Sequence, residues 1–203
     1  MHLDARGLPL STASPKAAAA FDHLVTGYLT FRVDTPDRLN AVLEADPDFA
    51  LAHCMKGYFA MLAFKQAVVP VAVEAARTAQ SLAAGATPRE RSHIAAVTAW
   101  AEGELDRAIA TWESILRDHP HDVVAFRLAH FVNFWLGRPQ DMVASVERVI
   151  PAWSEDIQAI HRYSPAAPSP RRRSVTISPP SHTGAVPSSS TPAICGPRTP
   201  SRM

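Results

Sequence analysis

Part of the sequence repeats with a period of 34 residues. Shifted by that distance, Gly103 aligns with Gly137 and Trp112 aligns with Val146. A glycine at this position can close one helix in a left-handed turn, and a bulky residue further on can fill the space between helices. The repetition therefore predicts stacked helix–turn–helix units. The other aligned pairs are Ala108 with Met142, Ile115 with Val149, Leu116 with Ile150, Val97 with Phe131, Trp100 with Phe134 and Ala101 with Trp135.

One helix–turn–helix per 34 residues is the period of tetratricopeptide repeats. We place such repeats at about 49–86, 87–120 and 121–154, inside a helical repeat domain covering residues 14–163. Residues 1–13 form an N-terminal extension. The expected fold is all-α, a tetratricopeptide-like α-solenoid of antiparallel helical hairpins with a disordered C-terminal tail. The alternative is a chance similarity between two amphipathic helix pairs.

Local signals mark where the helices begin and end. Thr87 can cap a helix that has Pro88 at its first position, and Glu90 completes a capping box. Ser14 and Pro15 open an earlier helix in a similar way. No segment of useful length alternates with period two, so we expect no sheet. The expected helices cover about 15–31, 35–45, 49–64, 71–84, 88–102, 105–118, 122–136 and 139–153.

Composition argues against several classes of function. Residues 1–163 carry a formal charge of −4, which argues against a nucleic-acid-binding face. Cys54 and Cys195 have neither a disulfide nor a zinc spacing, and we expect no metal or other cofactor. Charged residues and Pro70 interrupt the most apolar stretch, 51–73, so no membrane span is expected. With no signal-peptide pattern at the start, we expect a cytoplasmic protein.

The chemistry changes abruptly at residue 164. Residues 164–203 hold nine of the 18 prolines, nine serines and five arginines, with no Asp or Glu. Such a segment buries too little apolar surface to fold, so we predict disorder. Two origins remain open for it. It is a genuine basic tail, in which Arg171, Arg172 and Arg173 contact an anion or partner, or it is the product of a frameshift.

A longer match lies in residues 93–153. The runs Ala101-Glu102-Gly103, Trp112-Glu113-Ser114-Ile115-Leu116, Asp118-His119-Pro120, Trp135-Leu136-Gly137 and Pro151-Ala152-Trp153 resemble the tetratricopeptide repeat protein 38 family. Ala45-Asp46-Pro47 also fits the N-terminal part of that family. The resemblance covers most of residues 8–160 and implies a helical solenoid without established catalytic residues. Family members continue with further histidine-rich repeats, a pattern from which this chain departs after about Tyr163.

Candidate site residues are few. Three polar residues, Arg127, His130 and Asn133, recur every three residues on an otherwise apolar helix. This pattern predicts a polar stripe that faces a peptide-binding groove. The alternative is that neighbouring helices or solvent satisfy these polar groups. His119 and His121 are read as solvated turn residues rather than metal ligands. His53 and Cys54 point about 100° apart on a helix, which disfavours a catalytic pair. Trp100, Trp112 and Trp135 are read as core residues.

These features together predict a non-enzymatic helical-repeat scaffold that binds a peptide or protein segment in its concave groove, without nucleic acid or membrane. The alternative is a truncated fragment of a larger repeat protein, which could be an enzyme whose histidine-rich site lies in missing C-terminal repeats. A truncated array exposes the apolar face of its last hairpin, including Val143, Val146 and Ile150, so self-association is expected in that case.

Overall fold

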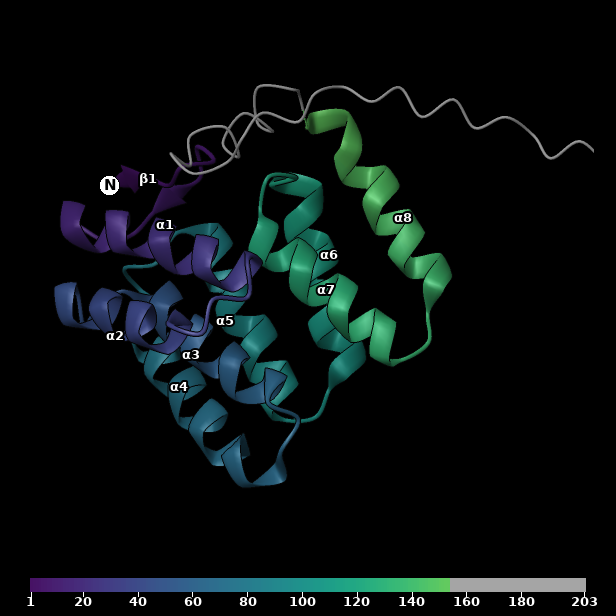
Figure 1. Ribbon diagram of the computed structural model, residues 1–203, viewed down its shortest axis with the longest axis horizontal. Coiled ribbons are helices and arrows are strands. Elements are labelled where there is room, and N and C mark those ends of the chain that lie inside the picture. The colour runs from purple at the N-terminus through teal and green to yellow at the C-terminus, as the bar shows by residue number, and fades with distance from the viewer. Residues whose placement is uncertain (154–203) are drawn as a thin grey trace, which may run out of the picture. The chain divides into compact units, whose positions relative to one another are not determined.

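The computed structural model describes residues 1–153, which form eight α-helices packed as sequential pairs (Figure 1). The predictions for residues 154–203, including the disordered tail, lie outside this range. A 3₁₀ turn, η1 (Gln66–Val68), precedes α4, and η2 (Ile150–Ala152) follows α8. The helices are α1 (Pro15–Leu29), α2 (Thr35–Ala45), α3 (Ala50–Leu62), α4 (Val69–Ser81), α5 (Pro88–Ala101), α6 (Leu105–Asp118), α7 (Val123–Trp135) and α8 (Pro139–Val149).

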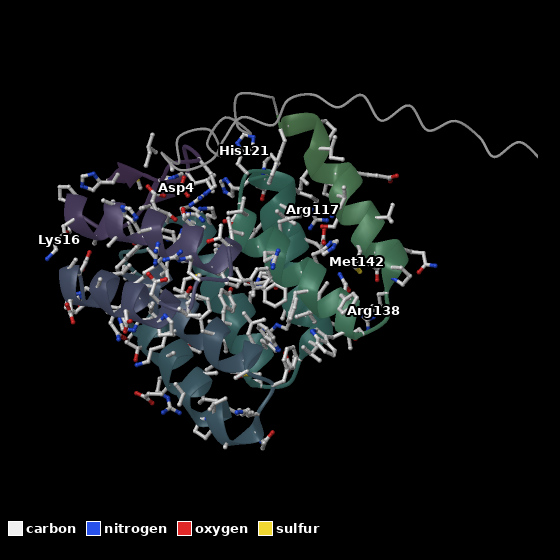
Figure 2. All side chains as sticks on the ribbon, in the orientation of Figure 1. Asp4, Lys16, Arg117, His121, Arg138 and Met142 are labelled. Atoms are coloured by element: carbon white, nitrogen blue, oxygen red, sulfur yellow. The ribbon has the colours of Figure 1, made fainter. Side chains whose placement is uncertain are left out.

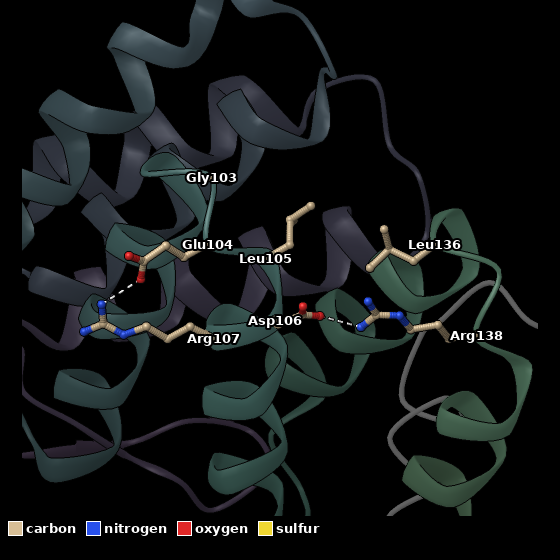
Figure 3. Close-up of a pocket in the computed structure, with 7 residues that line it drawn as sticks. All are labelled: Gly103, Glu104, Leu105, Asp106, Arg107, Leu136 and Arg138. Atoms are coloured by element: carbon tan, nitrogen blue, oxygen red, sulfur yellow. Dashed lines mark hydrogen bonds and ion pairs between the residues drawn. The ribbon is translucent and has the colours of Figure 1, made fainter.

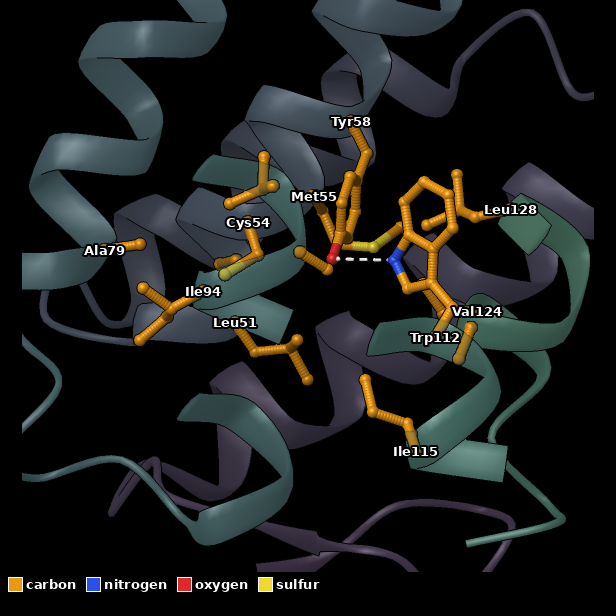
Figure 4. Packing of buried hydrophobic residues seen from close by; sticks show 14 of the residues in the cluster. Leu51, Cys54, Met55, Tyr58, Ala79, Ile94, Trp112, Ile115, Val124 and Leu128 are labelled. Atoms are coloured by element: carbon orange, nitrogen blue, oxygen red, sulfur yellow. Dashed lines mark hydrogen bonds between the residues drawn. The ribbon is translucent and has the colours of Figure 1, made fainter. Parts of the chain in front are cut away.

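Consecutive helices pack closely as hairpins, α1 with α2, α3 with α4, α5 with α6 and α7 with α8. The core runs between these pairs, because α3 also packs against α5 and α6 also packs against α7. Large side chains fill it completely: Phe21, Tyr58 and Trp112 are all fully buried. Figure 4 shows Tyr58 and Trp112 facing each other within this core. Sequential hairpin packing was predicted from the short connections and is confirmed.

The prediction of no sheet was wrong at the N-terminus. Strands β1 (His2–Leu3) and β2 (Pro9–Leu10) pair antiparallel, with His2 opposite Leu10. Two residues per strand are too few to show alternation in a sequence. The ribbon belongs to the body, because Leu10 is completely buried in the core.

Several predicted helix caps are confirmed. The Ser14 hydroxyl accepts from the backbone N–H of Ala17, and both hydrogen bonds of the Thr87–Glu90 capping box are present. Several boundaries differ by two to four residues: α4 spans Val69–Ser81 rather than about 71–84, and α8 ends at Val149 rather than near 153. Pro70 lies in the first turn of α4, where a proline needs no backbone donor and does not interrupt the helix.

All four hairpins turn out of their first helix through the same left-handed position. Gly103 and Gly137 occupy it after α5 and α7, with φ of 84° and 67°, as predicted. After α1 and α3 the same position holds Phe31 and Phe64, with φ of 55° and 49°. For a residue with a side chain, this conformation costs roughly 1–2 kcal/mol. The chain therefore carries strain at two of its four hairpins.

Candidate functional site

The three residues singled out on α7 lie in different surroundings. Arg127 and His130 are half-buried, whereas Asn133 is fully buried. Residues six positions apart point about 120° away from each other around a helix, so Asn133 does not share the face of Arg127. Neither polar atom of the Asn133 side chain has a hydrogen-bond partner among the described residues. That these residues contact a partner stays a prediction.

Arg127 instead lies in line with two aromatic residues. Phe131 and Trp135 follow it at four-residue spacing on one face of α7, with ring centroids 6.1 Å apart. Phe64, at the end of α3, packs against both rings at 6.0 and 5.5 Å. Phe134 lies 5.8 Å from Trp135. We call Phe31, Phe64, Phe131, Phe134 and Trp135 the aromatic surface.

Four of the five rings of the aromatic surface are exposed to solvent, and Phe131 is half-buried. Phe31 is 76% exposed, Phe134 and Trp135 are each 61% exposed, and Phe64 is 56% exposed. Within residues 1–153 these are all of the exposed Phe and Trp side chains. The reading of Trp135 as a core residue was therefore wrong, whereas Trp100 and Trp112 are buried as expected. A helical pattern places Trp135 on a face of α7, but another segment has to cover that face before the ring is buried.

Arg127 connects the two ends of this surface. Its guanidinium carbon lies 4.6 Å from the centroid of the Phe31 ring, a cation–π contact between α7 and the end of α1. Burial raises the pKa of the nearby Tyr28 hydroxyl to about 12, although Arg127 pulls it down. Tyr28 is therefore neutral at physiological pH and supplies no counter-charge. Arg127 has no ion pair with a carboxylate among the described residues.

A shallow pocket lies beside this surface, at the turns that join α5 to α6 and α7 to α8 (Figure 3). Its volume is about 490 Å³. The charged groups in it already pair with one another: Glu104 with Arg107 at 2.7 Å, and Asp106 with Arg138 at 2.6 Å. A pocket whose charges are satisfied internally offers little to hold or activate a small substrate.

A cluster of buried charged and polar side chains lies in the core instead. Asp122 accepts from Arg89 Nη1 at 2.6 Å and lies 3.0 Å from His93 Nε2. Its other oxygen caps α7 by accepting from the N–H of Ala125. Burial alone would raise the pKa of Asp122, but the charges of His93 and Arg89 and these hydrogen bonds hold it far below its usual range.

This cluster continues to the centre of the fold. The Tyr58 hydroxyl donates to the His93 carbonyl and lies 3.1 Å from His93 Nδ1. It also accepts from Trp112 Nε1 at 3.2 Å (Figure 4). Arg89 also donates to the Pro9 carbonyl, and Glu90 accepts from the N–H of Ser11. With side chains this enclosed, no substrate reaches the cluster. It joins the N-terminal ribbon, α3, α5, α6 and α7, and we read it as structural.

Sequence reasoning missed this cluster. Asp122 was visible as a helix start and Trp112 as a core residue, but nothing in the sequence pairs Arg89 or His93 with Asp122.

The Nε2–H of His121, which Figure 2 places beside the start of α7, donates to the Ala152 carbonyl at 2.7 Å. Across residues 1–153 no group of three metal-ligating side chains comes together. None of the described helices has the length and apolar character needed to cross a membrane.

The thiol of Cys54 is not a nucleophile in this fold. It is fully buried, and burial together with the charge of Glu90 raises its pKa well above the ordinary value. The neighbouring His53 makes a hydrogen bond from its Nε2 to the Pro47 carbonyl at 2.7 Å. The two side chains therefore lie in different environments, as their helical spacing predicted.

No protein-family model matches the chain, and no solved structure is similar enough to count as a match.

Proposed function

We propose that this protein is a non-enzymatic scaffold of the tetratricopeptide-like α-solenoid type, related to the tetratricopeptide repeat protein 38 family. It binds a peptide or protein segment in the groove formed by the first helices of its hairpins. The sequential hairpin packing and the left-handed position shared by all four hairpins support this proposal. A repeat protein stacks such units and exposes one extended surface for recognition.

The observation that carries the proposal is the aromatic surface. It gathers side chains from the ends of α1 and α3 and from α7, all of them first helices of hairpins. Monomeric proteins seldom expose several large aromatic rings side by side, and such clusters mark sites of protein interaction. Aromatic and arginine side chains are also the residues that contribute most to binding at interfaces.

The experiment is capture of a partner by the immobilised full chain, repeated over a range of salt concentrations, followed by amine-reactive cross-linking. Lys65 follows Phe64 directly, whereas Lys16 lies at the opposite end of α1 and serves as the internal control. We expect a partner that survives moderate salt and cross-links at Lys65 in preference to Lys16. The absence of any specific partner at every salt concentration would overturn the proposal.

The alternative is that the chain is a fragment of a larger repeat protein, with an activity in histidine-rich repeats that it lacks. The apolar face of α8 favours this alternative, because Val143 and Ile150 are 56% and 59% exposed. Val146 is half-buried. A following repeat would cover this face, and without one we expect self-association in size-exclusion chromatography.

Three measurements test this alternative. Sequencing the gene through the codon for Tyr163 and translating all three frames would show whether helical repeats continue in another frame. If they do, the restored protein is assayed for turnover, with His130→Ala as the variant. If the restored protein shows turnover and His130→Ala abolishes it, the result would support the alternative that the full repeat protein is an enzyme. A sharp monomer peak at high protein concentration would count against an uncovered last hairpin.

A further inference from the structure

Two residues of the aromatic surface, Phe31 and Phe64, carry backbone strain, and no other residue with a side chain in 1–153 has a positive φ. Phe31 and Phe64 hold the left-handed position that Gly103 and Gly137 hold in the other two hairpins. Glycine adopts this conformation without a steric penalty, so packing alone does not require phenylalanine there. The Phe31 ring in particular is 76% exposed and contributes little to the core. Strain of this kind persists where the side chain that it positions has a use.

The rings form separate walls rather than one flat face. Phe64 is tilted by 38° against Phe131 and by 51° against Trp135, and Phe131 and Trp135 stand at 72° to each other. At centroid distances of 5.5 to 6.1 Å the rings are in contact with one another, so they present an uneven apolar surface against which single apolar side chains can pack. That geometry suits a short extended segment, because a folded partner presents a broader surface.

Arg127 adds a charge to this apolar site. Its guanidinium lies over the Phe31 ring and beside the neutral Tyr28 hydroxyl, and no carboxylate among residues 1–153 pairs with its N–H groups. Those groups match the two oxygens of a carboxylate. Asp34, the acidic residue nearest to Phe31 in the sequence, is engaged by Arg32 and Arg38. By contrast, Arg89, Arg138 and Arg148 each have a carboxylate partner on another element.

We propose that the aromatic surface binds an extended acidic–apolar peptide, whose apolar side chains lie against Phe64 and Trp135 while its carboxylate pairs with Arg127. This inference rests on the proposed scaffold function and names the chemistry of its partner. A negative charge on the peptide complements Arg127, which has no carboxylate partner among residues 1–153 and lies among several exposed rings. Phe31 positions the guanidinium from the opposite side.

The test measures binding of a short fluorescein-labelled peptide, Pro-Leu-Glu-Leu-Pro with Gly-Ser ends, to the full chain by fluorescence anisotropy. A second peptide replaces Glu with Gln. We expect Arg127→Gln to weaken binding of the Glu peptide about tenfold, and the two peptides to bind this variant equally. Arg117→Gln is the control, because Arg117 is an exposed arginine on α6 without a carboxylate partner in the described residues.

A second arm separates function from folding. Phe31→Gly relieves the left-handed strain, so we expect an unchanged or higher midpoint of thermal unfolding together with weaker binding of the Glu peptide. Trp135→Ser should weaken both peptides alike, with a modest fall in the unfolding midpoint because the ring also packs against Phe64 and Phe131. A fall in the midpoint of Phe31→Gly, with unchanged binding, would show that the ring is structural and would overturn this use of the surface.

Other outcomes also decide the question. Equal binding of the two peptides to the unmodified chain would overturn the role of Arg127. If neither peptide binds although a partner is captured and cross-links at Lys65, the scaffold function stands and this peptide chemistry is wrong. A dimer that Trp135→Ser dissociates would identify a second copy of the chain as the occupant and would also overturn the inference.

Discussion

The indole N–H of Trp112 donates to the hydroxyl of Tyr58 across 3.2 Å, which joins two residues 54 positions apart in the chain. Tyr58 belongs to α3 and Trp112 to α6, so this bond lies between two different hairpins. Both side chains are fully buried. The bond therefore helps to set how one hairpin packs on the next, and removing it should lower the free energy of unfolding.

Tyr58→Phe should lower the free energy of unfolding by about 1–3 kcal/mol, because it leaves the Trp112 N–H buried without an acceptor. The loss should be smaller in a Trp112→Phe background, which has no indole N–H to leave unpaired. Urea unfolding of the four proteins measures the coupling. Additive losses in the double variant would show that the two groups act independently.

Acid should destabilise the fold through Asp122. Its pKa is lowered in the folded state, so its contribution is present above its ordinary value of 3.8 and is lost as the pH falls toward the lowered folded value. We expect the free energy of unfolding to fall as the pH drops below about 4. Asp122→Asn should be less stable at neutral pH and show a shallower dependence in this window. An unchanged slope in chemical unfolding at several pH values would contradict the assignment.

The N-terminal ribbon should contribute to stability through one of its leucines. Leu10 is fully buried, whereas Leu3 on the paired strand is 64% exposed. Leu10→Ala should therefore cost about 2–5 kcal/mol, and the matched variant Leu3→Ala should cost much less. Guanidinium unfolding of both variants gives the comparison. Similar losses at the two positions would mean that the ribbon is detached in solution.

Cys54 should resist modification until the protein unfolds. Because burial and the charge of Glu90 raise the pKa of the thiol, little thiolate forms and reagent does not reach it. In a Cys195→Ser variant, which leaves one thiol, Ellman's reagent should react rapidly with Cys54 in denaturant and negligibly without it. Rapid labelling of the native protein would show that α3 opens readily.

The caps at Ser14 and Thr87 and the left-handed glycines at 103 and 137 were predicted because each depends on residues close together in the chain. Two features of the candidate site escaped prediction for the opposite reason. Phe31 and Phe64 have a left-handed backbone conformation that a phenylalanine disfavours, and the packing of the hairpins around them holds them there. Trp135 has a core-like sequence context, but no described segment covers it.

The sequence by itself determined where helices begin and end and that neighbours pair as hairpins, because capping, helical periodicity and short connections are local. Tertiary structure alone decided which residues from distant helices meet. It placed Asp122 with Arg89 and His93 in the core, and it brought Phe64 of α3 onto Phe131 and Trp135 of α7. Such pairs depend on how the hairpins stack, which is a sum of many weak packing contacts rather than a property of any one segment.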